Sequence, residues 1–103
     1  MALPVLMSLA TATARGDEWP QWRGPDRDGV WRETGIVKKF DGPQLPIRWR
    51  MPISGGYTGP TVAAGRVYVM DRPDEPAGAE RVLCFDAHTG KSLWTYRYPC
   101  AYK

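Results

Sequence analysis

Four short apolar segments, separated by turn-forming residues, follow one another between residues 59 and 98. We predict β-strands at Thr61–Ala64, Arg66–Asp71, Arg81–Ala87 and Ser92–Tyr98. Successive side chains of a strand point to opposite faces of its sheet. Since apolar residues occupy successive positions here, both faces of the sheet should be covered by other structure. The sequence therefore predicts an all-β fold with one antiparallel sheet, in which consecutive strands are neighbours.

A single four-stranded sheet cannot bury two apolar faces by itself, and 103 residues permit one small domain at most. Similar sheets stacked on both sides would cover them, and stacked four-stranded sheets are the blades of a β-propeller. We interpret residues 59–98 as one blade and residues 99–103 as the start of a truncated next segment. Because repeat units depend on their neighbours, this fragment alone should fold poorly.

The first 14 residues have the features of a secretory signal peptide. Ala2–Ala14 is uncharged, contains a short apolar stretch and ends in overlapping Ala-x-Ala patterns, which are typical of a cleavage site. The stretch is shorter than the roughly 20 residues that cross a bilayer. We predict cleavage after Ala14, export to the periplasm or the extracellular space, and no transmembrane span. An uncleaved, disordered tail is the alternative.

Two further regions precede the predicted blade. Residues 15–46 are rich in turn formers but contain Trp19, Trp22 and Trp31, which predicts an irregular extension that packs over a core. Residues 47–53 alternate apolar and basic side chains, as in a half-buried strand. Since no Thr-Gly pair precedes Trp49, we interpret this strand as one that completes the last blade and closes a ring.

Cysteine, histidine and charge limit the chemistry of the chain. Cys84, Cys100 and His88 are its only cysteines and histidine, fewer than the roughly four ligands of a zinc site. Cys84 should be buried opposite Trp94, with Cys100 too far along the strand for a disulfide. The net charge is +3 and the basic residues are scattered, so we expect no nucleic-acid partner.

The residues Cys84–Trp94 read CFDAHTGKSLW. Asp and Thr side chains hydrogen-bond readily across turns, and a tryptophan offers a large face for stacking. The run resembles the tryptophan-docking motif A-x-D-x-x-T-G-K-x-x-W of the PQQ-repeat β-propellers. The matching residues are Asp86, Thr89, Gly90, Lys91 and Trp94, while Cys84 stands where the family usually has Ala. The resemblance implies a structural role, in which Trp94 stacks on a blade outside these residues. We predict no catalytic, cofactor-binding or metal-binding residue in the chain.

The resemblance leaves two functions open. One is a non-catalytic propeller that binds or assembles partners in the bacterial envelope, similar to the outer-membrane assembly factor of the PQQ-repeat type. The other is a dehydrogenase that uses pyrroloquinoline quinone (PQQ) and calcium. Such enzymes carry Asp, Glu and Asn in their sites and often a Cys-Cys pair, whereas this chain has neither Asn nor adjacent cysteines. The start of the extension, Trp19–Pro25, also resembles the start of exported PQQ-like propeller proteins.

Overall fold

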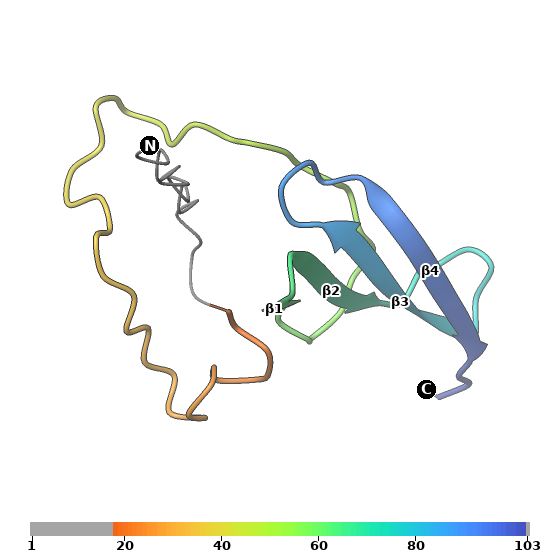
Figure 1. Cartoon of the computed structure of the whole chain (residues 1–103). Helices are drawn as coiled ribbons and strands as arrows, with labels where there is room; N and C mark the ends of the chain where they lie inside the picture. The colour runs from red at the N-terminus through yellow and green to blue at the C-terminus, as the bar shows by residue number, and fades with distance from the viewer. Residues whose placement is uncertain (1–17, 103) are drawn as a thin grey trace, which may run out of the picture.

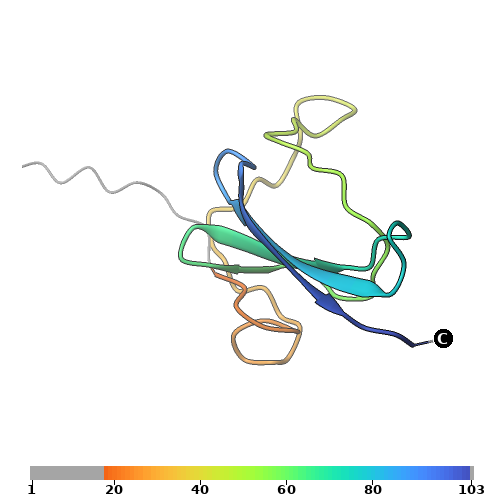
Figure 2. The same cartoon turned by 90° about the vertical axis from the view of Figure 1, so that its right-hand side faces the viewer.

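Strands form where β-branched and aromatic residues favour extended backbone. The structure is a computed structural model that describes residues 18–102. Its strands are β1 (Thr61–Ala63), β2 (Arg66–Asp71), β3 (Ala79–Asp86) and β4 (Ser92–Pro99). They form one antiparallel sheet in the order β1-β2-β3-β4, which Figure 1 shows and Figure 2 presents after a quarter turn. The predicted all-β fold, its four strands and their order are confirmed.

The strand register assigns the side chains to two faces of the sheet. Val67 lies opposite Phe85 and Val69 opposite Leu83, so these residues share one face. Tyr68 lies opposite Cys84, which in turn lies opposite Trp94, and these three share the other face. We call the first the covered face, because Leu83 and Phe85 are buried. We call the second the open face, because Met70, Trp94 and Tyr96 are partly exposed on it.

The covered face is closed in part by a segment of the same chain, residues 47–54, which passes behind the sheet in the view of Figure 1. Trp49 lies against Phe85, with ring centroids 6.2 Å apart. Further along, the amide of Arg72 donates to the carbonyl of Gly55 at 2.9 Å. Residues 47–53 form no strand within the described residues, and their pairing with a further blade stays a prediction. This segment is held by side-chain packing and isolated hydrogen bonds rather than by a backbone ladder.

A partly buried ion pair fixes the same segment at the far end of the sheet. Asp71 and Arg81 are cross-strand partners on β2 and β3, and Arg81 donates twice to the Asp71 carboxylate, at 2.9 and 2.6 Å. The amide of Ser54 donates to the same carboxylate at 2.8 Å. These hydrogen bonds, that of Arg81 first, hold the pKa of Asp71 below its ordinary value. Asp71 is only 3% exposed, so the carboxylate depends on these three donors for its solvation.

The N-terminal extension contacts the sheet at its beginning and then departs from it. Trp19 forms an isolated antiparallel bridge with Val62 of β1, through hydrogen bonds of 2.9 and 2.8 Å. From about residue 30 to residue 46 the chain runs away from the sheet (Figure 1), and its apolar side chains are exposed. Those side chains are Val30, Trp31, Ile36, Val37, Phe40 and Leu45. Among the described residues, the predicted packing over a core is present only at the start of the extension, and no described apolar surface lies beneath the rest of it.

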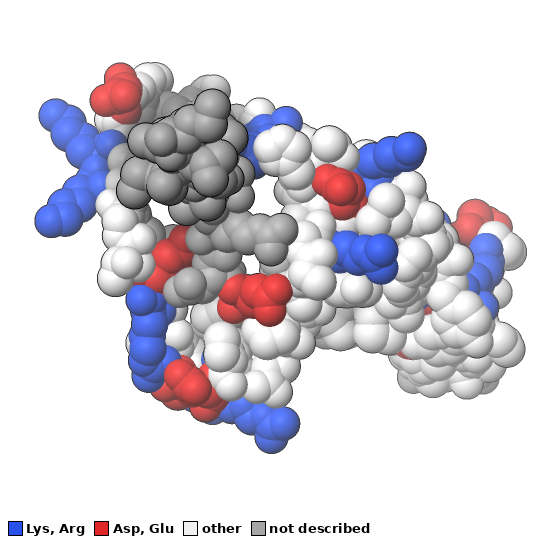
Figure 3. All heavy atoms as spheres, viewed as in Figure 1, with Lys and Arg blue, Asp and Glu red and all other residues white. Residues whose placement is uncertain are grey.

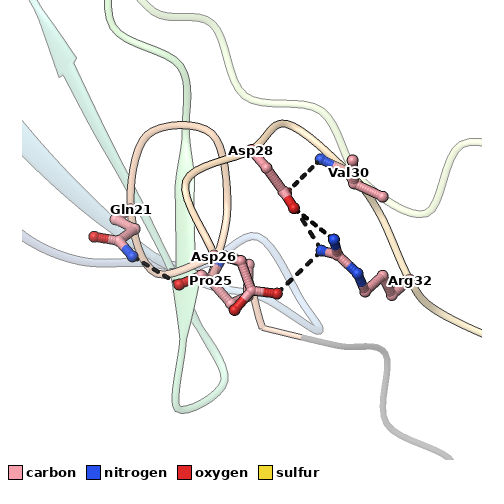
Figure 4. A network of polar contacts seen from close by, with 6 residues as sticks. All are labelled: Gln21, Pro25, Asp26, Asp28, Val30 and Arg32. Carbon is pink, nitrogen blue, oxygen red and sulfur yellow. Dashed lines mark hydrogen bonds and ion pairs between the residues drawn. The ribbon is translucent and has the colours of Figure 1, made fainter.

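Three charged residues of the extension, Asp26, Asp28 and Arg32, pair with one another. Arg32 forms ion pairs with Asp26 and Asp28, and the amide of Val30 donates to Asp28 at 3.0 Å (Figure 4). The hydrogen bond from Arg32 is the largest cause that lowers the pKa of Asp28. On the face shown in Figure 3, acidic and basic groups are interspersed and form no continuous basic stripe.

No helix within residues 18–102 has the length and hydropathy that crossing a bilayer requires. The signal peptide predicted for residues 1–14 lies outside the described part of the chain.

Candidate functional site

The turn between β3 and β4, residues Asp86–Lys91, is held rigid by its own hydrogen bonds; we call it the docking turn. The Asp86 carboxylate accepts the amides of His88 and Thr89 at 2.9 and 2.8 Å, and these bonds lower its pKa. The amide of Gly90 donates to the Asp86 carbonyl at 2.8 Å. The amide of Lys91 donates to the Thr89 hydroxyl at 3.2 Å. The hydrogen-bonding predicted for Asp86 and Thr89 is thus present, and Lys91 takes part through its backbone.

The indole ring of Trp49 lies against the backbone of Gly90. Gly90 has a φ of +74°, a conformation that glycine adopts without steric cost. A Cβ built on Gly90 would lie 2.6 Å from Cδ2 of Trp49, so only a glycine leaves room for the ring. The indole Nε1 of Trp49 donates to the carbonyl of Ala87 at 2.9 Å. The docking turn therefore binds a tryptophan through one flat surface and one directed hydrogen bond.

Two further contacts surround the docked ring. Phe85, the buried residue just before the turn, packs at 42° to the plane of Trp49. Beside the ring, Arg48 Nη1 lies 3.1 Å from His88 Nδ1. Because a guanidinium has no acceptor, Nδ1 of His88 accepts in this contact. His88 therefore has a neighbour from residues 47–53.

Cys84, the residue at the start of the motif, lies in the middle of the open face and is fully buried. Its flanking partners, Tyr68 and Trp94, lean toward each other over it until their ring centroids are 6.0 Å apart. The predicted burial of Cys84 opposite Trp94 is confirmed. The position requires a small side chain, because a longer one would separate the two rings. Cys84 and Cys100 are both free thiols.

The ring of Trp94 contacts that of Tyr68, and 41% of the Trp94 residue is exposed to solvent. Tyr96, the next residue of the same face, is 61% exposed. Within the described residues, the open face thus presents large apolar side chains that no other segment covers in full. The sheet consequently has a docking turn filled by Trp49 and, on its open face, a tryptophan with an exposed ring.

The predicted motif residues are brought together in two places. Asp86, Thr89, Gly90 and Lys91 build the docking turn, whereas Cys84 and Trp94 lie on the open face. The sequence interpretation missed the role of Trp49. A signal for it existed, since Trp49 precedes Trp94 by 45 residues and each is followed eight residues later by a tyrosine.

A second polar cluster lies at the opposite end of the sheet. The hydroxyl of Tyr98 donates to Glu80, which raises the pKa of Tyr98 to about 12 and lowers that of Glu80. Arg72 lies 4.2 Å over the ring of Tyr102 and donates to the carbonyl of Cys100 at 2.8 Å. These contacts attach the residues after β4 to the sheet. We find no nucleophile–base pair in this cluster.

Residues 18–102 bring together no group of three or more His, Cys, Asp or Glu side chains that could hold a metal ion.

The fold and the site together define an all-β chain with one open four-stranded antiparallel sheet and a turn that binds tryptophan. No family model, curated protein or solved structure matches the chain.

Proposed function

We propose that the chain is the N-terminal part of a PQQ-repeat β-propeller that acts as a non-catalytic binding or assembly scaffold in the bacterial envelope. The observation that carries this proposal is the docking of Trp49 on Gly90 and Ala87. A tryptophan from another part of the chain occupies the motif turn, as the resemblance implies for the tryptophan of a neighbouring blade. The resemblance to the tryptophan-docking motif rests on the sequence alone, and the contact of Trp49 supports it independently.

The same contact supports closure of a ring by residues 47–53. In a closed propeller, the first blade has the last blade as a neighbour, and the motif turn of the first blade receives the last blade's tryptophan. Here Trp49 occupies the motif turn, and this contact supports such an arrangement. We propose that residues 47–53 pair with the last blade in the whole protein and there acquire the strand conformation that they lack in this structure. A structure of the whole protein in which this segment is unpaired would contradict the proposal.

The proposed partners of the sheet are, first, further blades of the same protein, which would cover the open face. The exposed ring of Trp94 would stack on the glycine of a similar turn, with its indole nitrogen on a backbone carbonyl, as Trp49 does on this turn. Envelope proteins would then bind the rims of the assembled ring. The proposed export follows from the signal-like residues 1–14.

One experiment separates the scaffold from a quinone-dependent dehydrogenase. The full-length protein, purified from its own host's envelope after in vivo cross-linking, is examined for cross-linked partners and for quinone absorbance. A scaffold should yield specific envelope proteins and no stoichiometric quinone. Bound PQQ together with calcium-dependent oxidation of an alcohol or sugar would overturn the proposal. A variant with Trp94→Ala, which should disrupt blade stacking, serves as the control for specific cross-links.

A further inference from the structure

A groove of about 950 Å³ lies beside β1 and continues onto the open face. Its lining includes Trp19, Trp22, Tyr57, Tyr68, Met70 and Val82. Tyr68, Met70 and Val82 belong to the open face by their strand register, whereas Val62 and Val69, which also line the groove at the edge of the sheet, belong to the covered face. The groove and the open face are therefore one continuous apolar surface, part of which comes from the N-terminal extension.

The loop that supplies Trp19 and Trp22 is attached firmly to β1. Besides the backbone bridge from Trp19 to Val62, the Glu18 carboxylate accepts the amide of Ala64 at 2.7 Å. The ring of Trp19 lies so close over Gly24 that a Cβ there would be 2.6 Å from it. This loop thus holds Trp22 at a fixed place beside the groove, rather than letting it move freely in solvent.

The two aromatic side chains at the border of the groove are nevertheless left in water. Trp22 is 69% exposed although its ring contacts Gly59, and Tyr57 is fully exposed. Large aromatic side chains on a supported backbone are enriched where proteins bind one another, because they bury much area at little cost in conformational entropy. Among the described residues that line the groove, Arg23 alone is charged, so an apolar surface fits it better than a polar ligand does.

We infer that Trp22 and Tyr57 belong to the interface with the sheet that stacks on the open face, so that the loop of residues 18–29 joins β1 to that second sheet. The occupant is a further four-stranded sheet of the same kind. This inference rests on the proposed blade stacking and adds to it a binding role for the N-terminal loop. The continuity of the groove with the face that carries Trp94 is the observation that carries it.

The test uses the full-length protein labelled with 5-fluorotryptophan. Single Trp→Phe variants assign the ¹⁹F signals, and a soluble nitroxide reports how accessible each ring is to solvent. Trp31, which is 58% exposed on the part of the extension that leaves the sheet, is the reference for an accessible ring. We expect the nitroxide to broaden the signals of both Trp22 and Trp94 several-fold less than that of Trp31.

The outcomes distinguish the binding role of the N-terminal loop from the blade stacking on which it rests. If Trp94 is protected while Trp22 is as accessible as Trp31, the stacking stands and the role of the loop is wrong. If both rings are as accessible as Trp31, the stacking is wrong and the inference fails with it. As a second measurement, Trp22→Ala should lower the melting temperature of the full-length protein by several degrees, whereas Trp31→Ala should leave it unchanged. Equal melting temperatures for the two variants would contradict the inference.

Discussion

The indole of Trp49 lies on the backbone of Gly90, and the two residues leave no room for an additional methyl group between them. The contact joins positions 41 residues apart, and it fixes the irregular segment before β1 to the turn that follows β3. The conformation of Gly90 and the hydrogen bond from Trp49 to Ala87 can each be removed by a single substitution.

Gly90→Ala should destabilise the protein by about 2–4 kcal/mol, because alanine is strained at positive φ and its Cβ would displace Trp49. Gly65→Ala is the matched control. Gly65 has nearly the same φ, +73°, but a Cβ there meets nothing within 4 Å. The control should cost only about 1–2 kcal/mol of backbone strain. Urea unfolding measures both losses, and equal values would show that Trp49 is not held by Gly90.

Trp49→Phe should cost about 0.5–1.5 kcal/mol more than Trp31→Phe in the free energy of unfolding. The phenyl ring retains an aromatic surface over Gly90 but cannot donate to the Ala87 carbonyl, which loses its indole donor. Trp31 also donates through Nε1, to Glu33, yet this hydrogen bond is exposed and water replaces it. Chemical denaturation of the two variants checks the difference, and a Trp49→Phe variant as stable as Trp31→Phe would count against the docking contact.

Acid should remove the stabilisation that comes from Asp71. Its pKa is held below the ordinary value of 3.8 by Arg81, so its folded form binds a proton less readily than its unfolded form. The contribution is therefore complete above about pH 5 and declines as the pH falls through 3.8 toward the lower folded pKa. Asp71→Asn should lose about 1–3 kcal/mol at pH 7 and show a flatter stability profile from pH 5 to pH 2.5.

Asp28→Asn is the control for this pH dependence. The pKa of Asp28 is also lowered, by Arg32, but both side chains are exposed and solvent screens their interaction. Its profile should follow that of the unmodified protein. If the stability difference between Asp71→Asn and the unmodified protein is the same at pH 2.5 and pH 7, the assignment to Asp71 is wrong.

Replacing Cys84 by a smaller side chain should destabilise the protein less than replacing it by a larger one. Cys84→Ala should cost about 1 kcal/mol or less because the rings of Tyr68 and Trp94 still meet above it, whereas Cys84→Leu should cost about 1–3 kcal/mol by forcing them apart. Thermal melts compare the two. In the native protein a thiol reagent should label Cys100 rapidly and Cys84 only after unfolding. Rapid labelling of both cysteines would contradict the packing described.

The strands could be predicted from the sequence because their cause is local. The pattern of apolar residues around Val67 and Val69 is visible within a few residues. So are the glycines that permit tight turns. The start of β3 was placed two residues late, at Arg81 instead of Ala79, because Ala79 and Glu80 follow a proline- and glycine-containing loop and show no apolar alternation. The Asp71–Arg81 pair was missed, although Asp71 ends one predicted strand and Arg81 begins the next.

The docking of Trp49 could not be derived from local pattern. Nothing in the residues around Trp49 indicates which turn receives it, since the contact depends on how the chain returns past β3. The extension is the opposite case. Its tryptophans predicted packing, but whether an apolar side chain is buried depends on a partner surface, and only Trp19 and its immediate neighbours have one among the described residues.

The contact between Trp49 and the docking turn joins two different surfaces, a turn that receives a tryptophan ring and a segment that supplies one. The two faces of the sheet are therefore not equivalent. A tryptophan enters the turn from the side of the covered face, while Trp94 extends from the other side. Head-to-tail contacts of this kind give rings when the rotation between units closes and open filaments when it does not. Because Trp49 of the same chain already fills the turn, a tryptophan from another molecule is excluded from it. The N-terminal segment thereby blocks polymerisation through this surface.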